Sequence, residues 1–232
     1  MSTAMILAAG RGERMRPLTD HRPKCLLVAG GKSLIEWHIH ALQRVGHRDL
    51  IINHAWLGQQ IEAALGDGQR YGVRIRYSAE AQALETAGGI AQALTLMQDE
   101  VFLVVNGDIF TDFDFSSLGA IKARMESPSN SLRAHLVLVR NPVHNLKGDF
   151  ALNGERVSLD DSPRHTFSGI GVYHRAMFES IPVGSRAPLA PLLKQCITSD
   201  SVTAHLHDGL WLDVGTPERL ALADELARAR SL

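Results

Sequence analysis

The amino-acid sequence predicts an α/β fold with a mostly parallel central sheet and helices on both faces. Apolar runs typical of strands alternate with segments of helical periodicity along most of the chain, and this alternation is typical of parallel strands joined by helices. The run 101–105 is apolar at every position, as a strand buried on both faces should be. The 232 residues, 45% of them hydrophobic, suit one domain over residues 1–232 with a sizeable core.

The expected elements follow in chain order. Strands are predicted at 3–9, 50–53, 73–78, 101–106, 133–140, 166–174 and 202–207. Helices are predicted at 33–45, 57–65, 86–97, 115–125, 188–198 and 216–230. Thr216 can cap the last helix, and Pro217 suits its first turn. Between 141 and 159 the alternation stops, and Asn153-Gly154 predicts a hairpin between 149–152 and 156–159 that covers one side of the sheet.

The composition argues against several classes of protein. The net charge is -1, from 24 basic and 25 acidic residues, and no basic tract stands out. Nucleic acid is therefore not an expected partner. No window approaches the roughly 20 apolar residues of a membrane span. The two cysteines do not resemble a disulfide framework or a CxxC metal site, so we expect a reducing, cytoplasmic location without membrane attachment.

The first strand leads into a glycine-rich turn. Gly10 and Gly12 can let phosphate oxygens approach backbone N–H groups closely. The charge of a triphosphate can be neutralised by four cations in and after this turn: Arg11, Arg14, Arg16 and Lys24. Taken alone, the segment is also explained by an ordinary turn with solvated arginines. A dinucleotide fingerprint is excluded because position 15 is Met, and a P-loop is excluded because GxxxxGK[ST] is absent.

Two acidic residues are candidates for holding a divalent cation. Asp108 follows a buried strand, at the edge of a parallel sheet where ligands bind. Asp213 precedes the last helix. Mg²⁺ takes one or two carboxylates and completes its shell with water and phosphate oxygens, so the two acids would suffice if the fold brings them together. For each acid alone, a turn or capping role is the alternative.

These segments resemble the sugar-1-phosphate nucleotidyltransferases in order and spacing. The resemblance rests on Leu-Ala-Ala-Gly-Arg-Gly-Glu-Arg-Met-Arg-Pro-Leu-Thr at 7–19, Arg-Pro-Lys at 22–24, Asn-Gly-Asp at 106–108 and Trp-Leu-Asp-Val-Gly-Thr at 211–216. It implies a Rossmann-like nucleotidyltransferase fold. It also implies in-line attack by a sugar-1-phosphate oxygen on the α-phosphorus of a nucleoside triphosphate. No covalent enzyme intermediate is implied.

The resemblance implies roles for individual residues. Arg14 would stabilise the leaving β- and γ-phosphates and Lys24 the α-phosphate, while Asp108 and Asp213 would hold Mg²⁺. The nucleotide would contact Leu7, Ala8, Gly10, Gly12, Glu80, Thr86, Ala87 and Gly88, with Glu80 reading the base. The sugar phosphate would contact Asn106, Gly148, Asp161 and Trp211. A place in the core is the alternative for Trp211.

The sequence departs from the family pattern in two places. Glu85 stands where many members have glycine. Asp161-Ser162-Pro163 stands where many members have Glu-Lys-Pro, so the lysine that touches the sugar phosphate is missing. Lys147 and Arg164 are nearby cations, although a plain surface role is the alternative for both.

Within the family, the expected lack of a further C-terminal domain and the segments 167–173 and 214–220 favour one branch. Its members transfer a uridylyl group from UTP to N-acetylmuramate α-1-phosphate in peptidoglycan recycling. A guanylyltransferase for mannose- or heptose-1-phosphate is the alternative, and an inactive nucleotide-sensing subunit is the alternative of a different class. The lactyl carboxylate of N-acetylmuramate needs a cationic or N–H partner, and the candidates are Lys147, Arg164, His165 and Arg186.

Overall fold

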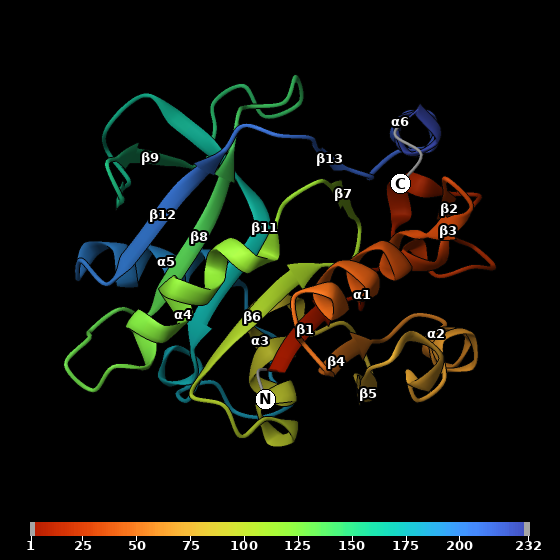
Figure 1. Cartoon of the computed structure of the whole chain (residues 1–232), viewed down its shortest axis with the longest axis horizontal. Coiled ribbons are helices and arrows are strands. Elements are labelled where there is room, and N and C mark those ends of the chain that lie inside the picture. Colours follow the sequence, from red (N-terminus) through yellow and green to blue (C-terminus); the bar gives the residue numbers. More distant parts are fainter. Residues whose placement is uncertain (1–2, 230–232) are drawn as a thin grey trace.

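A nine-stranded mixed sheet forms the centre of the computed structural model, which describes residues 3–229 (Figure 1). The strand order is β5-β4-β1-β6-β11-β8-β12-β10-β9. One half of the sheet is entirely parallel and contains β1 (Thr3–Leu7), β4 (Asp49–His54), β5 (Arg74–Ala79) and β6 (Val101–Asn106). In the other half, β12 (Val202–His207) runs parallel to β8 (Ala134–Val139), and β11 (Arg164–His174) runs antiparallel between β6 and β8. The predicted α/β fold is confirmed: seven of the nine strands of this sheet run in the same direction, although four of the strand pairings are parallel and five are antiparallel.

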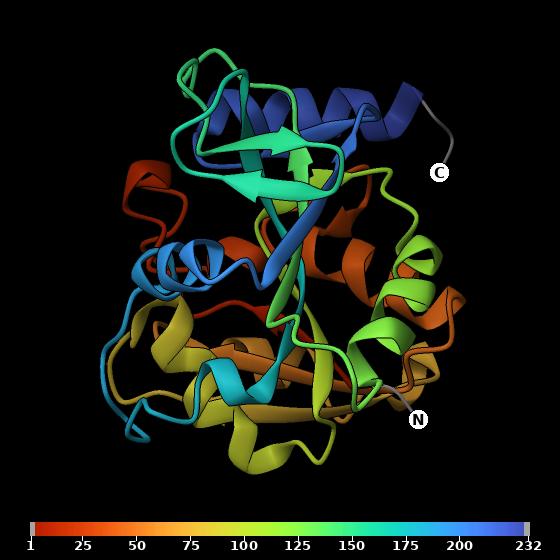
Figure 2. The ribbon, with the colours of Figure 1, turned by 90° about the vertical axis from the view of Figure 1, so that its left-hand side faces the viewer.

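The middle section of the chain extends the sheet. β9 (Phe150–Asn153) and β10 (Arg156–Ser158) form the predicted hairpin, which Figure 2 shows as the green strands in the upper part of the view. β10 pairs with β12, and β9 also pairs with the start of β11, so these strands form a closed ring with β8. The expectation that this section covers one side of the sheet is wrong, because the hairpin hydrogen-bonds to strands that would otherwise present open edges.

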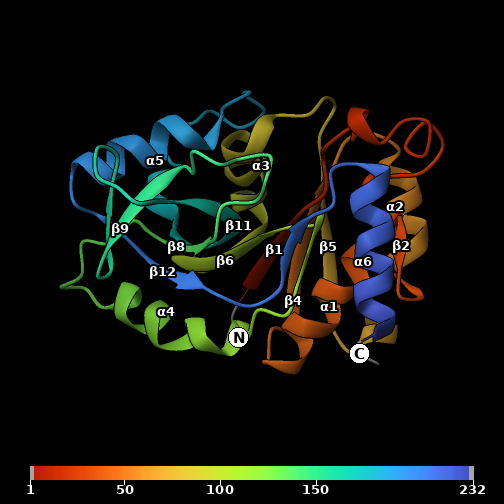
Figure 3. The same ribbon diagram turned by 90° about the horizontal axis from the view of Figure 1, so that it is seen from above.

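The helices divide between the two faces of the sheet. On one face lie α1 (Leu34–Arg44), α2 (Gly58–Leu65) and α4 (Gly119–Glu126), and on the other lie α3 (Glu85–Ala93) and α5 (Leu189–Thr198) (Figure 3). Alternate residues of each strand serve the two faces, so Ile6 packs with the first group of helices and Met5 with the second. The predicted arrangement of helices on both faces is confirmed.

A third apolar cluster forms around α6 (Pro217–Ala229). This helix packs against the short hairpin of β2 (Val28–Ala29) and β3 (Lys32–Ser33). As expected, Thr216 caps it, because the hydroxyl accepts a hydrogen bond from the Arg219 N–H at 3.4 Å. No helix within residues 3–229 is long and apolar enough to span a bilayer.

Several short elements were not predicted from the sequence. The strands are β2, β3, β7 (Ile109–Thr111) and β13 (Trp211–Asp213). The 3-10 helices outside the predicted helices are Glu13–Met15, Lys24–Leu26, Gln69–Tyr71 and Arg175–Met177, whereas Leu94–Leu96 and Phe115–Leu118 fall within the predicted helices 86–97 and 115–125. Segments of two or three residues show no period from which an element can be recognised.

Candidate functional site

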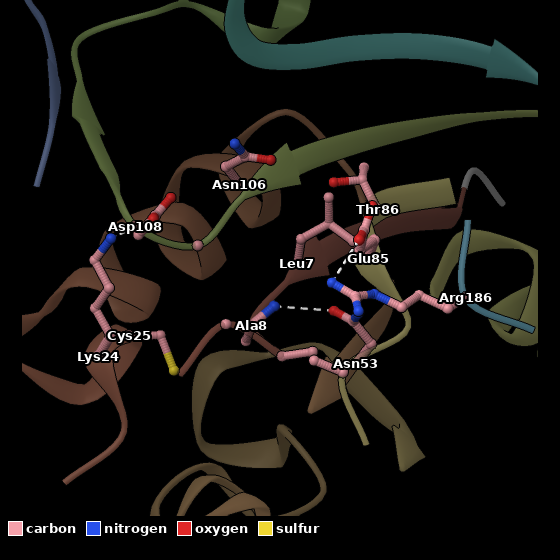
Figure 4. Close-up of a pocket in the computed structure, with 14 residues that line it drawn as sticks. Leu7, Ala8, Lys24, Cys25, Asn53, Glu85, Thr86, Asn106, Asp108 and Arg186 are labelled. Carbon is pink, nitrogen blue, oxygen red and sulfur yellow. Dashed lines mark hydrogen bonds and ion pairs between the residues drawn. The ribbon is translucent and has the colours of Figure 1, made fainter. Parts of the chain in front are cut away.

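A cavity opens at the carboxyl ends of three parallel strands. The chain leaves β1 to pair β4 on one side and later returns to pair β6 on the other, and ligands of open α/β sheets bind at such a crossover. Leu7 is in register with Asn53 of β4 and with Asn106 of β6. The cavity holds about 330 Å³, and the predicted site residues that line it are Leu7, Ala8, Gly10, Lys24, Thr86, Asn106 and Asp108 (Figure 4).

A chain of buried hydrogen bonds fixes the wall formed by the end of β1. The Ala8 N–H donates to Asn53 Oδ1 at 2.9 Å, and Asn53 Nδ2 donates to Glu80 Oε1 at 2.7 Å. The other oxygen of Glu80 accepts from the Leu84 N–H at 2.8 Å. Glu80 is therefore buried beside the cavity without lining it, and burial raises the pKa of its carboxyl against the opposing effect of these hydrogen bonds. Its base-reading role stays a prediction.

Two of the four cations near the glycine-rich turn are engaged locally. Arg11 donates to the Thr19 carbonyl at 2.7 Å and to Asp20 Oδ1 at 3.0 Å, and Arg16 donates to the same carboxylate oxygen at 2.8 Å. Arg11 also lies 4.0 Å over the ring of Trp56. Of the four cations predicted to neutralise a triphosphate, this leaves Arg14 and Lys24 to face a ligand, and Lys24 does so beside its ion-pair partner Asp108.

Gly12 is required by the shape of this turn. It has φ +68°, and a Cβ there would lie 3.1 Å from the side chains of Lys24 and Thr19. Its backbone carbonyl also accepts a hydrogen bond from the Thr19 hydroxyl at 2.8 Å. A Cβ on Gly10 would meet no heavy atom within 4 Å, and this glycine lines the cavity directly. The two predicted glycines thus have different parts, one shaping the turn and one leaving room.

Lys24 and Asp108 form an ion pair in the wall of the cavity. Lys24 Nζ lies 2.5 Å from Asp108 Oδ2, and the lysine side chain is 12% exposed. Figure 4 shows the lysine amino group next to the carboxylate. Gly107 permits this turn, because its N–H donates to the Leu7 carbonyl at 2.8 Å and a Cβ there would lie 2.9 Å from that oxygen.

The unpredicted strands β7 and β13 bring the two acids together. They pair antiparallel with Asp213 opposite Ile109, and the Val214 N–H donates to the Asp108 carbonyl at 2.8 Å. Residues 105 positions apart in the sequence are thereby adjacent across one ladder. Both carboxylates retain exposed surface, 37% for Asp108 and 24% for Asp213.

Basic side chains surround Asp213. Arg219 Nη1 lies 2.5 Å and His144 Nε2 lies 2.9 Å from Asp213 Oδ1. The Arg14 guanidinium is near, because a Cβ on Gly215 would lie 3.1 Å from Arg14 Nη2 and 2.7 Å from an Arg219 nitrogen. The contacts of Arg219 and His144 were not predicted. A cation in the first turn of a helix opposes the helix dipole, and this signal points to an anion near Arg219; nothing in the sequence singles out His144.

The two carboxylates suit a hard divalent cation such as Mg²⁺. Within residues 3–229 no group of three or more His, Cys, Asp and Glu is placed to hold a metal. An ion at Asp108 and Asp213 would therefore complete its shell with phosphate and water oxygens, which is the usual arrangement for Mg²⁺. In the structure, Lys24 and Arg219 supply the positive charge beside these acids.

Cys25 lines the cavity but is not a ready nucleophile. Burial, helped by the charge of Asp108, raises the pKa of the Cys25 thiol to about 12. The thiol therefore stays protonated at neutral pH, and the reactive form of cysteine is the thiolate.

A second, larger cavity of about 960 Å³ adjoins the first and shares Glu85, Thr86 and Asn106 with it. Gly148 lines it as predicted, and its φ of +62° places a Cβ 2.8 Å from the backbone of Arg164. The other two predicted sugar contacts lie outside its lining. Asp160 lines the cavity in place of Asp161, and Trp211 donates from Nε1 to the Ser168 carbonyl at 2.9 Å while packing against the core.

The start of α3 supports a loop that reaches the first cavity. The N–H groups of Ala87 and Gly88 both donate to the Ala187 carbonyl at 3.0 Å. These two predicted residues are buried and hold the loop, whereas Thr86 lines the cavity. The loop carries Arg186, whose guanidinium lies 2.7 Å from the Glu85 carboxylate (Figure 4). Glu85 has φ +61°, which explains why glycine suits this position better.

Comparison with known proteins gives consistent results. A protein-family model described as nucleotidyl transferase matches residues 3–142. The N-acetylmuramate alpha-1-phosphate uridylyltransferase of Neisseria meningitidis serogroup B is 54% identical over 230 residues, covering 97% of this chain and 98% of that protein. The protein of the same name from Caulobacter vibrioides is 32% identical and covers 97% of each chain. A crystal structure of a putative glucose-1-phosphate thymidylyltransferase from Bacillus anthracis, in complex with a sucrose, superposes with TM-score 0.85 at 20% identity over 98% of this chain and 96% of that one.

Proposed function

Because this chain belongs to the nucleotidyl transferase family, we propose that it transfers the uridylyl group of UTP to N-acetylmuramate α-1-phosphate. The products are UDP-N-acetylmuramate and pyrophosphate. The observation that carries the chemistry is the pairing of β7 with β13, which brings Asp213 next to the turn that carries Asp108, the ion-pair partner of Lys24. The choice of substrates is supported by the 54% identity to a protein named for that reaction.

The reaction is an in-line displacement at the α-phosphorus. A bond forms from an oxygen of the sugar phosphate to this phosphorus, and the bond to the bridging oxygen breaks, so pyrophosphate leaves with the electron pair. The attacking phosphate is already anionic and needs no general base. Catalysis then consists of positioning and charge neutralisation. This suits the first cavity, because Cys25, the thiol among its described lining residues, is held protonated.

Each charged residue has a distinct part in the proposed reaction. Lys24 would neutralise the α-phosphate, and Arg14 would stabilise the departing pyrophosphate. Asp108 and Asp213 would hold Mg²⁺, which supplies a positive charge to the phosphate oxygens when bound. Arg219 and His144 would orient Asp213, in view of their contacts with its carboxylate at 2.5 Å and 2.9 Å.

The first cavity would hold the nucleotide, with the base against Leu7, Ala8 and Gly10. Asn53 is a further wall residue there. The second cavity would hold the sugar, because it adjoins the phosphate-binding end through Asn106. UTP and N-acetylmuramate phosphate would meet the enzyme in the cytoplasm, where recovered peptidoglycan sugars are reused.

The test is a substrate panel with purified protein. UTP, GTP, CTP and dTTP are each combined with N-acetylmuramate, N-acetylglucosamine, glucose and mannose 1-phosphates, and pyrophosphate release is measured with Mg²⁺ and with excess chelator. We expect the highest kcat/KM for UTP with N-acetylmuramate 1-phosphate, and no turnover with chelator. A preference for GTP with mannose 1-phosphate would replace this proposal by a guanylyltransferase, and nucleotide binding without turnover would indicate a sensing subunit.

A further inference from the structure

Two cationic side chains line the larger cavity without a protein partner. Arg164 stands at the start of β11 and Lys194 on α5. Neither side chain has a hydrogen bond or an ion pair to any other residue within 3–229. Other arginines of the same half of the sheet are paired, as Arg156 is with Asp200 at 3.1 Å and Arg140 is with Asp208 at 2.8 Å. The two cations on the cavity wall are therefore available to an anionic ligand.

The acids around the same cavity are mostly satisfied by the protein. Asp149 accepts hydrogen bonds from the Phe167 N–H at 2.8 Å and from Asn145 at 3.2 Å. Glu85 is paired with Arg186 at 2.7 Å. Asp160 is the remaining acid of the lining, and it is exposed. Asp160 and Asp149 are the two acids of the lining without a cationic partner among the described residues, so their charges oppose binding of an anion there.

The dimensions of the cavity suit the non-reacting end of a sugar phosphate. Its volume of about 960 Å³ is at the upper end of the range for small-molecule sites. It meets the first cavity at Thr86 and Asn106, so a sugar whose C1 phosphate lies near Lys24 extends into it. Apolar side chains, including those of Phe167 and Leu193, share the wall with the two cations. This mixture matches a lactyl ether, which carries a methyl group beside a carboxylate.

We propose that Arg164 and Lys194 bind the lactyl carboxylate of N-acetylmuramate and thereby select it over hexosamine phosphates that lack this group. The inference rests on the proposed function. It also distinguishes among the four residues that the sequence offered as partners of the lactyl carboxylate. Lys147 and His165 are absent from the lining of both cavities, and Arg186 lies on the nucleotide cavity with Glu85 as its partner.

The experiment compares two ligands that differ only in the lactyl group. Dissociation constants of UDP-N-acetylmuramate and UDP-N-acetylglucosamine are measured by calorimetry for the unmodified protein and for Arg164→Met, Lys194→Met and the double variant. We expect each single change to weaken UDP-N-acetylmuramate binding about 5- to 10-fold, since the lost hydrogen bonds are charged but partly screened. Binding of UDP-N-acetylglucosamine should change less than about 2-fold, because it makes no charged contact with either residue.

Two matched variants control for surface charge. Lys147→Met removes a cation outside both cavities and should leave both affinities unchanged, whereas Asp160→Asn removes one of the opposing charges and should tighten binding of UDP-N-acetylmuramate alone. Thermal melting establishes that every variant is folded.

Equal losses for the two ligands would overturn the proposal, because they would assign Arg164 and Lys194 to the phosphates common to both. Unchanged affinities would overturn it as well. Turnover of N-acetylmuramate 1-phosphate by the unmodified protein is measured alongside. With turnover present, these outcomes reject the carboxylate site alone; with turnover absent, the proposed function fails and the carboxylate site fails with it.

Discussion

Asp108 is the residue on which most of the site depends. Its side chain contacts Lys24, and its backbone carbonyl holds the chain beside Asp213. We predict that Asp108→Asn lowers kcat at least ~100-fold, because the substitution keeps the shape and removes the charge that, in the proposed mechanism, would hold a divalent ion. Steady-state pyrophosphate release and Mg²⁺ affinity are the measurements. The control is Asp112→Asn, which removes a carboxylate close by in the sequence that pairs with His207, at 3.1 Å, instead of with Lys24. A near-normal rate for the Asp108 variant would remove the metal role.

Glu80 provides a test between a base-reading role and a structural one. The structure has both its oxygens occupied, by Asn53 and by the Leu84 N–H. We predict that Glu80→Ala lowers the free energy of unfolding by about 2–3 kcal/mol, because two buried donors lose their acceptor, and raises KM for UTP through displacement of Asn53. Urea unfolding and kinetics with all four triphosphates measure this. An altered base preference at unchanged stability would instead support direct reading of the base.

Residues could be predicted where one continuous segment carried the signal. Gly10 and Lys24 belong to motifs in the segment after β1, Asp108 belongs to the motif directly after β6, and all three line the first cavity. Arg186 and Asn53 were not assigned to the cavity, since their places depend on contacts between elements distant in sequence. Glu80 was assigned to the base from its position in the sequence. In the structure it is buried beside the cavity and supports the cavity wall through its hydrogen bonds.

At the level of elements, long periodic segments were predicted within a few residues and short ones were missed. β6 was expected at 101–106 and is found at Val101–Asn106. β7 and β13 have three residues each, and only their mutual pairing defines them. The closure of β9 onto β11 was equally beyond reach, because the hydrogen bonds that select an edge leave no trace in the local sequence.

The packing of α3 on the loop before α5 predicts a large effect of one methyl group. A Cβ on Gly88 would lie 2.2 Å from the Ser185 carbonyl, whereas a Cβ on Gly119, at the start of α4, meets nothing within 4 Å. We predict that Gly88→Ala lowers the free energy of unfolding by about 2–3 kcal/mol. In contrast, Gly119→Ala should raise it by about 0.5–1 kcal/mol. Urea unfolding of the pair measures both, and equal effects would contradict this packing.

For the whole molecule, buried imidazoles predict how stability depends on pH. Burial lowers the pKa of His38 and of His135 to about 4 in each case, against about 6.5 for an unfolded chain. Between these values the unfolded state binds protons that the folded state does not. The free energy of unfolding is therefore complete above pH 6.5 and falls as the pH drops toward 4, by on the order of 3 kcal/mol for each histidine.

Urea unfolding between pH 7.5 and 4.5 measures this slope. His135→Gln should have a shallower slope than the unmodified protein, whatever its effect on absolute stability, because glutamine does not titrate. An exposed histidine changed in the same way, His21→Gln, should leave the slope as it was. The prediction fails if the slope of the His135 variant matches that of the unmodified protein.

The pairing of β7 with β13 has a consequence for protein synthesis. The three strands whose carboxyl ends form the first cavity have all been synthesised once translation has passed Asn106, but Asp213 is added more than a hundred codons later. By the proposed mechanism, a nascent chain that ends before β13 lacks one of the two carboxylates and cannot transfer a nucleotidyl group. Transfer would start only when β13 docks on β7, so an incomplete polypeptide would not consume the cell's triphosphates.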